Sequence, residues 1–177
     1  MSDFKTGGVP TPDYDSDDIN FVSQKSEFTE DVFIYSDVYA ESFNNVGDNL
    51  PTVNKHPYFL HTMWVNYQKQ TEFNPTHFHK GVYSFVIWMQ IPTEYNEQKE
   101  NPIAKNTNSD VISNFTFDYR DMLGEYRYYT YKMSKKMEGM MLFFPSSLTH
   151  TVYPFYNCSE NRISISGNIG LDTNIIM

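Results

Sequence analysis

Three histidines stand where the chain could bind a metal ion. His77 and His79 are two residues apart, directly before an apolar run, and His150 lies in a distant segment. Side chains at positions i and i+2 of an extended strand point to the same face, so the first two imidazoles can reach one ion. A third imidazole from another strand would complete three ligands on one side of a metal, with its other positions open. Taken singly, each histidine also fits an ordinary loop or strand-edge position.

A second group that could do chemistry is an arginine at the start of an alternating segment. In RISISGNI (162–169), Arg162 and Ser164 share one face with Ser166 and Asn168, while isoleucines take the other face. A guanidinium binds a carboxylate through two parallel hydrogen bonds, and a nearby hydroxyl can donate to the same oxygens. The pattern therefore predicts a carboxylate-binding site, although a solvated polar face shows the same alternation.

The segments that carry these residues are predicted to be short strands. Phe, Tyr and Trp make up 17% of the chain, and aromatic and β-branched residues favour pleated, half-buried surfaces. The near-continuous apolar run at 82–91 indicates a strand buried on both faces. Further strands are predicted at 58–68, 111–119, 125–133, 139–145, 148–155 and 162–169. Such spacing, without a long helix between the strands, is typical of an antiparallel sandwich or barrel.

The acidity of the chain belongs mostly to its first residues. The formal net charge is -9, and residues 1–31 hold eight acidic and two basic side chains, hence -6 of that total. This stretch is predicted to be an acidic N-terminal arm, and 32–177 a single domain with a weak helical signal at 32–46. A global acidic excess repels phosphate backbones, which disfavours a general nucleic-acid binder.

Other classes of protein are disfavoured by what the sequence lacks. The single cysteine, Cys158, excludes an internal disulfide and any zinc site that needs two cysteine ligands. The first residues have no basic and apolar regions of a signal peptide. The longest apolar run is about half of the roughly 20 residues that a membrane helix needs. We therefore expect a cytoplasmic protein that does not span a membrane.

Two segments of the chain resemble the 2-oxoglutarate/Fe(II)-dependent oxygenases, most closely their small bacterial and phage-type members. These segments are WVNYQKQTEFNPTHFHKGVYSFVIWMQIP (64–92) and MLFFPSSLTHTVYPFYNCSENRISISGNI (141–169). The second is the more specific, because a strand ending in FPS precedes a histidine and then an Arg-x-Ser motif. The resemblance covers about residues 58–170. It implies an all-β, double-stranded β-helix (jelly-roll) core with an irregular or partly helical N-terminal region.

The resemblance also implies roles for the histidines. The family's first metal ligand falls on His77 and its last on His150. The middle ligand is an aspartate or glutamate in most of the superfamily, and here the position is His79. Imidazole suits Fe(II), so three histidines can still hold the ion, but the site is poorer by one negative charge. The sequence leaves open whether His79 binds the metal, another group does, or the activity has been lost.

The same likeness assigns a cosubstrate site. Arg162 falls on the family's cosubstrate arginine, with Ser164 as its partner, and Asn66 and Gln68 fall on positions that line the pocket. The implied function is a dioxygenase that uses Fe(II), O2 and 2-oxoglutarate to hydroxylate an unidentified substrate, with release of succinate and CO2. No catalytic residue is expected beyond the metal ligands. The loop at 92–110 and the N-terminal region would cover the substrate cleft.

Two alternatives remain open at this stage. A cupin-type metal enzyme that does not use 2-oxoglutarate also has a His-x-His motif and a later histidine. Its first motif usually adds a glutamate a few residues on, and residues 80–84 contain no acid. A non-enzymatic jelly-roll binding protein would keep only the fold, because a fold alone does not imply a function.

Overall fold

The computed structural model describes residues 55–176 of the chain. Two compact units divide the chain, Met1–Asn45 and Val46–Met177, and all described residues belong to the second unit. The predicted acidic arm at 1–31 and the weak helical signal at 32–46 lie outside the described residues. The domain boundaries given by the sequence therefore stay a prediction.

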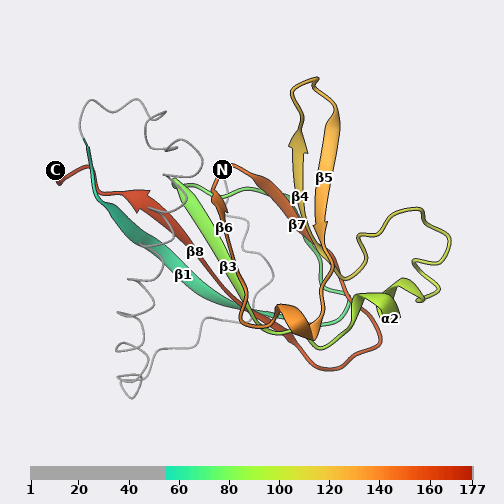
Figure 1. Ribbon diagram of the computed structural model, residues 1–177. Coiled ribbons are helices and arrows are strands. Elements are labelled where there is room, and N and C mark those ends of the chain that lie inside the picture. The colour runs from blue at the N-terminus through green and yellow to red at the C-terminus, as the bar shows by residue number, and fades with distance from the viewer. Residues whose placement is uncertain (1–54, 177) are drawn as a thin grey trace, which may run out of the picture. The chain divides into compact units, whose positions relative to one another are not determined.

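The described part of the chain is built mainly from strands (Figure 1). A five-residue helix lies within the segment 92–110, which the sequence predicts to be a loop. In chain order, the elements are β1 (Tyr58–Gln68), β2 (Asn74–His77), β3 (Tyr83–Gln90), α2 (Tyr95–Lys99), β4 (Phe115–Arg120), β5 (Tyr126–Tyr131), the 3-10 turn η2 (Lys135–Met137), β6 (Met141–Pro145), β7 (Thr149–Val152) and β8 (Arg162–Leu171). None of the described helices is long and apolar enough to cross a membrane.

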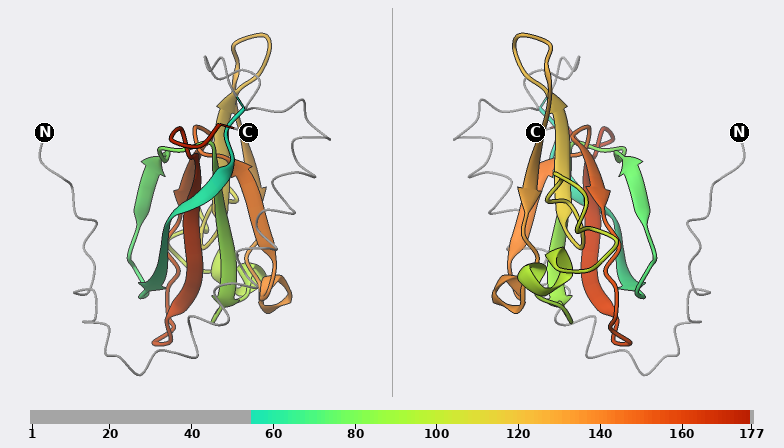
Figure 2. Two further views of the ribbon diagram at one scale, coloured as in Figure 1. Left: turned by 90° about the vertical axis from the view of Figure 1, so that its left-hand side faces the viewer. Right: turned by 90° about the vertical axis from the view of Figure 1, so that its right-hand side faces the viewer.

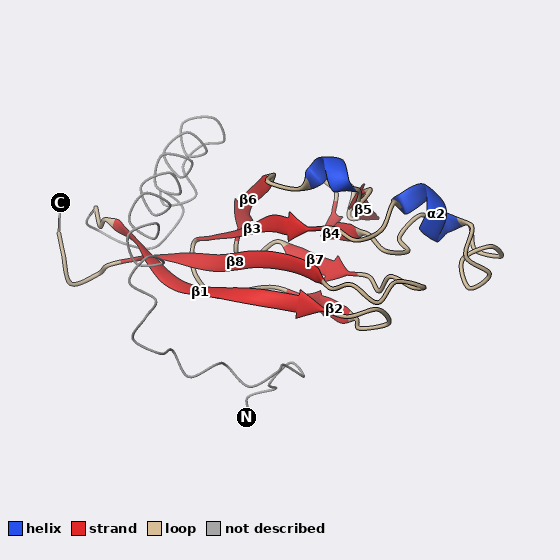
Figure 3. Cartoon of the chain, turned by 90° about the horizontal axis from the view of Figure 1, so that it is seen from below, coloured by secondary structure: helices blue, strands red, loops and turns tan. Residues whose placement is uncertain are grey.

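The strands form two four-stranded antiparallel sheets. The first sheet has the order β1-β8-β3-β6, and the second has the order β2-β7-β4-β5. Figure 3 shows the strands of the two sheets running alongside one another. The chain crosses between the sheets after β1, β2, β3, β5, β6 and β7. This is the double-stranded β-helix that the resemblance implies, and the predicted fold class is confirmed.

The space between the sheets is filled by aromatic and aliphatic side chains. The central cluster contains Trp88 from β3, Phe115 and Phe117 from β4, and Phe144 from β6. Removing one such side chain from water stabilises the fold by about 2–3 kcal/mol, so this layer holds the sheets together. β3 is paired on both sides and buried from Tyr83 to Trp88, as its apolar run predicts. At these positions the aromatic side chains form the core, whereas others, such as Tyr67 and Tyr126, are exposed.

The hairpin β4–β5 shows both a success and a failure of the strand prediction. The two strands pair antiparallel around a turn in which Gly124 adopts a φ of 81°, as the turn at Leu123-Gly124 predicts. The hairpin projects beyond its neighbours (Figure 2). The predicted strand at 111–119 is too long, however, because β4 begins at Phe115. Ser113 adopts a φ of 63°, which ends the extended conformation before β4.

Candidate metal centre

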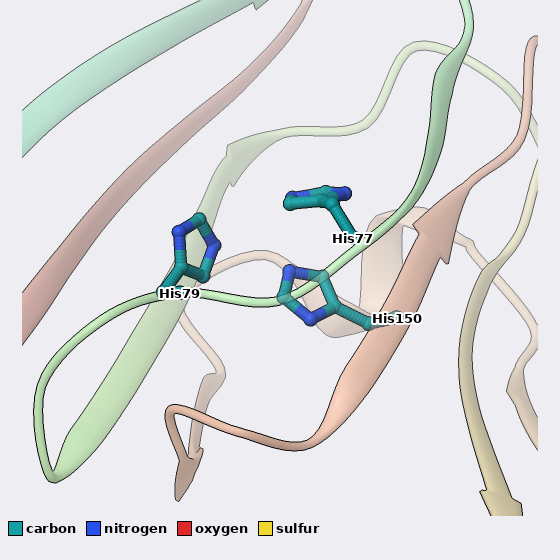
Figure 4. Close-up of side chains that lie close together, drawn as sticks. All are labelled: His77, His79 and His150. Carbon is teal, nitrogen blue, oxygen red and sulfur yellow. The ribbon is translucent and has the colours of Figure 1, made fainter. Parts of the chain in front are cut away.

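Three imidazoles, from β2, from β7 and from the turn that follows β2, lie close together (Figure 4). One potential ligand atom from each of His77, His79 and His150 lies within 4.8 Å of the others. The ring centroids are 4.3 Å apart for His77 and His150, 5.0 Å for His77 and His79, and 5.1 Å for His79 and His150. Nitrogen ligands bind a transition metal at about 2.1 Å, so small ring rotations bring the three nitrogens onto one ion.

Two of these histidines are placed by neighbouring strands. His77 ends β2, His150 lies in β7, and the two are directly opposite in the antiparallel register. Side chains at opposite positions share a face and have Cβ atoms about 5 Å apart. The face is the inner one, because His150 stacks on the ring of Phe115 at 5.4 Å. The pairing of β2 with β7 thus brings together ligands that are distant in sequence.

His79 is held in a different way from the other two. β2 ends at His77, so the expectation that both imidazoles project from one strand is wrong. The backbone N–H of His79 donates to the Ser146 carbonyl at 2.9 Å, and that of Val82 donates to the Ile169 carbonyl at 2.7 Å. Between them Gly81 adopts a φ of 125°, and a Cβ there would lie 2.7 Å from the Ile169 oxygen. A turn pinned to β8 therefore carries this imidazole.

The tautomers of two rings suit metal binding. Nδ1 of His77 lies 2.7 Å from the Pro75 carbonyl, and Nδ1 of His150 lies 3.1 Å from the Leu148 carbonyl. A carbonyl only accepts hydrogen bonds, so Nδ1 carries the proton in each ring and Nε2 keeps its lone pair. Metal-binding histidines commonly have such an outer hydrogen bond, which fixes the orientation of the ring. The donor set therefore fits a divalent metal such as Fe(II), which imidazole binds well.

The surroundings keep His79 and His150 neutral. Burial, followed by the positive charge that His77 can carry, lowers the pKa of His79 to about 4. Burial likewise lowers the pKa of His150 to about 4, with smaller contributions from His77 and His79. Imidazoles with such pKa values keep their lone pairs at neutral pH. The indole of Trp64, 5.5 Å from the His79 ring, forms part of the wall.

Arg162 reaches from the first sheet to the second. It begins β8, is 3% exposed, and donates from Nη2 to the carbonyl and hydroxyl oxygens of Ser113 at 2.6 and 2.9 Å. Nη1 donates to Oε1 of Gln68 at 3.1 Å and to the Tyr153 carbonyl at 3.4 Å. The guanidinium lies over the ring of Phe155 at 5.1 Å. Its Nε–H, also buried, has no partner among the described residues.

No carboxylate compensates this charge within the described part of the chain. The ion pairs there join Arg127 to Asp121 and Glu125. Burial lowers the pKa of Arg162 to about 10, which still leaves the group charged at neutral pH. Since a buried, unpaired charge is costly, the site favours an anion that comes from outside the described residues.

The structure brings together only some of the residues that the sequence predicts around Arg162. Gln68 contacts the guanidinium directly. Ser164 makes no hydrogen bond to it, and its hydroxyl lies 3.4 Å from the amide of Asn66. The same amide lies 3.3 Å from the hydroxyl of Ser166. Asn66 and Ser164 therefore form a separate polar patch on the same sheet.

The sequence analysis missed Ser113, which anchors the guanidinium. Ser113 is fully buried, and its own N–H donates to the Pro154 carbonyl at 3.0 Å. Only the following Asn114, a residue type that favours turns, could have signalled that the strand begins at Phe115 and not at 111. The contact itself joins segments that are far apart in the sequence, so no local pattern shows it.

A jelly roll with a facial set of imidazoles and a buried arginine is an architecture suited to metal-dependent oxygenases. Comparison with known proteins makes the class specific. The chain matches the family model described as "Putative 2OG-Fe(II) oxygenase" over residues 62–168, and it belongs to this family. The match includes the three histidines and Arg162. No curated protein matches the chain.

Proposed function

We propose that the protein is an Fe(II)- and 2-oxoglutarate-dependent dioxygenase that hydroxylates a substrate still to be identified. The observation that carries the proposal is the buried guanidinium of Arg162, which no carboxylate of residues 55–176 neutralises, in a domain that also gathers three imidazoles. Family membership supports the use of iron and 2-oxoglutarate in general. The particular residues and the hydroxylation reaction are the proposal.

In this proposal the imidazoles of His77, His79 and His150 hold Fe(II) from one side. Fe(II) held there would supply the activation of O2 that couples decarboxylation of 2-oxoglutarate to succinate with transfer of the other oxygen atom to a substrate C–H bond. The chain supplies orientation and exclusion of water. The rings of Phe115 and Phe117 lie 5.4 and 6.3 Å from that of His150, and they limit access of water from the core side.

Arg162 provides the positive charge for the distal carboxylate of 2-oxoglutarate. Its Nε–H is the one guanidinium donor without a partner among the described residues. The contact to the Tyr153 carbonyl, at 3.4 Å, is the longest of the remaining four, and a carboxylate can replace it most easily. Asn66 and Ser164 offer further polar groups on the same sheet.

The test is an anaerobic titration of the protein with Fe(II) and then 2-oxoglutarate, followed by visible absorption and calorimetry. We expect a charge-transfer band in the wild type and no band in Arg162→Met, which still binds Fe(II). Arg120→Met is the matched control, because Arg120 is exposed and bonds only the Gly124 carbonyl. A wild type that binds Fe(II) but no 2-oxoglutarate contradicts the cosubstrate assignment.

One observation favours a second candidate, a cupin-type metal enzyme without 2-oxoglutarate. The four terminal N–H groups of Arg162 all have acceptors within the protein, namely on Gln68, Ser113 and Tyr153. An arginine saturated in this way could serve as a structural link between the sheets. The same titration separates the two functions, since the cupin-type enzyme binds the metal and leaves 2-oxoglutarate free.

A further inference from the structure

The reverse face of the second sheet carries a chain of hydrogen bonds. The hydroxyl of Thr151 donates to Oδ2 of Asp118 at 3.0 Å. The hydroxyls of Thr76 and Thr151 are 2.7 Å apart. A hydroxyl has one proton, and that of Thr151 is used on Asp118, so Thr76 must be the donor to Thr151. The chain therefore runs in one direction, from Thr76 through Thr151 to Asp118.

This chain lies directly behind the candidate metal ligands. Thr76 precedes His77, and Thr151 follows His150. Successive side chains of a strand point to opposite faces, so the threonines project away from the imidazoles of their neighbours. Each hydroxyl is thus one residue from a ligand, on the other side of the same backbone.

Few backbone hydrogen bonds join β2 to its neighbour β7. β2 pairs with β7 at Asn74 and His77, and the register is irregular between these two positions. The strand has four residues and contains Pro75, which has no N–H to donate. The Thr76–Thr151 bond lies within this irregular stretch. It ties β2 to β7 where the ladder does not.

Asp118 anchors the far end of the chain. Its side chain is 7% exposed, and Thr151 is 1% exposed. Oδ1 accepts a hydrogen bond from the hydroxyl of Tyr126 at 2.7 Å, and the carbonyl of Asp118 accepts one from the hydroxyl of Thr149. Hydrogen bonds that end on a buried carboxylate are stronger than bonds between neutral groups. The link thus joins β2, β7, β4 and β5.

We infer that Thr76, Thr151 and Asp118 are positioning residues of the metal centre. They fix the separation of the two strands that bear His77 and His150, and hence the distance between two Nε2 atoms. The inference rests on the proposed metal site. None of the three residues touches the ion, and their effect passes through the backbone. The free energy of one net hydrogen bond corresponds to a change of up to about 10-fold in metal binding.

The chain offers a matched control for this inference. Thr116 lies opposite Thr151 in the β4–β7 register and is also 1% exposed. Its hydroxyl has no hydrogen-bond partner among the described residues. Thr151→Val and Thr116→Val are therefore the same change, at equal burial on the same face. Only the first removes a link in the chain.

The experiment measures binding of Co(II), a redox-stable probe whose visible absorption reports its coordination. We expect Thr151→Val to weaken Co(II) binding by about 5- to 10-fold and to change the band shape. Thr151→Ser, which restores the hydroxyl, should bind within about 2-fold of the wild type, and Thr116→Val should bind equally well. Urea unfolding of the metal-free variants shows that each is folded. The exposed Thr76→Val change gives a second weakening with less risk to folding.

The outcomes separate this inference from the proposed function. Equal Co(II) affinity and equal spectra in Thr151→Val and Thr116→Val overturn the inference while leaving the metal site in place. Weakening in Thr151→Val that Thr151→Ser does not restore also overturns it, because the hydroxyl is then not the cause. A wild type that binds no Co(II) overturns the proposed metal site, and with it this role of the three residues.

Discussion

The imidazole cluster and the Arg162 site belong to the same domain, but their polar atoms are prepared in opposite ways. In His77 and His150 one ring nitrogen is anchored by a carbonyl two residues earlier, and the other is left to bind. In Arg162 four of five N–H groups are satisfied by the protein, and Nε alone lacks a partner in the described region. One site is arranged for binding, and the other for holding a charge in place.

This difference predicts where each site is sensitive. Metal affinity should depend on the spacing of three rings that come from two strands and a turn. Cosubstrate affinity should depend on the acceptors that hold the guanidinium, because an incoming carboxylate must compete with them. Changes around Arg162 should therefore leave the affinity for Fe(II), measured without 2-oxoglutarate, nearly unchanged.

The largest effect is expected for His150→Ala. His150 is the most buried ligand, and its loss removes one nitrogen and its packing on Phe115. We expect Fe(II) affinity to fall by more than about 100-fold, with a loss of about 2–3 kcal/mol in unfolding free energy. Anaerobic Fe(II) titration and urea unfolding measure the two effects. His61→Ala is the control, since His61 is exposed on β1 and outside the cluster. An unaltered Fe(II) affinity in His150→Ala would show that His150 is not a metal ligand.

His79 gives the next largest effect and decides the ligand set. If it binds the metal, His79→Ala weakens Fe(II) binding by about 10- to 100-fold, a smaller loss than for His150 because the ring is less buried. His79→Asp restores the carboxylate that most of the superfamily has at this position. It should bind Fe(II) at least as tightly as the wild type, because the site gains a negative charge. Identical affinities in His79→Ala and the wild type would exclude this imidazole as a ligand.

The site could be predicted from the sequence where its signals are local. The alternation in 162–168 places Arg162 on a polar inner face, and the apolar run places β3 in the core. These patterns depend only on the two-residue period of a strand, so the face of each residue can be predicted without knowing the tertiary structure. The resemblance to the oxygenase family adds that His77 and His150 belong to one metal site, which no local pattern shows.

The rest of the site depends on contacts between distant segments. β2 is too short and too polar to be recognised, and it exists because β7 lies beside it. Ser113 has a positive φ, so it lies outside the strand that the sequence predicts there, and in this conformation it binds Arg162. Thr151 looks like an ordinary strand residue, and Thr76 like a loop residue, until the register is known. Sequence patterns give the face of a residue, whereas its partners are set by tertiary pairing.

Replacement of Arg162 by lysine tests whether the charge or the planar group matters. A lysine keeps a charge but cannot reach Gln68 and Ser113 together, and a buried ammonium loses its proton more readily than a guanidinium. We expect 2-oxoglutarate affinity to fall by about 10- to 50-fold and stability by about 2–4 kcal/mol, with Fe(II) affinity unchanged. Calorimetry and urea unfolding provide the values. Wild-type affinity for 2-oxoglutarate in this variant would show that the fork geometry is not required.

The stability of the metal-free protein should depend on pH through the histidines. The pKa of His79 and His150 is about 4 in the folded protein, below the ordinary value of 6.5. Between these values the unfolded chain binds more protons, so the unfolding free energy falls as pH decreases from about 6.5 to about 4. The buried His150 contributes a slope of up to about 1.4 kcal/mol per pH unit. Urea unfolding at several pH values tests this, and His150→Gln should flatten the curve; an unchanged slope in that variant would contradict the assignment.

The smallest effect, and the sharpest test of the contrast between the two sites, comes from Ser113→Ala. The change removes the hydroxyl that accepts from Nη2 at 2.9 Å, while the carbonyl contact remains. Alanine and serine are similar at a φ of 63°, so backbone strain is not altered. We expect 2-oxoglutarate affinity to fall by about 5-fold and Fe(II) affinity to stay constant. Ser164→Ala is the matched control, because Ser164 makes no hydrogen bond to Arg162, and its loss should be about 2-fold. A larger loss of 2-oxoglutarate affinity in Ser164→Ala than in Ser113→Ala would mean that the carboxylate binds the hydroxyl of Ser164 directly. The hydrogen bonds that hold the guanidinium would then not determine the affinity.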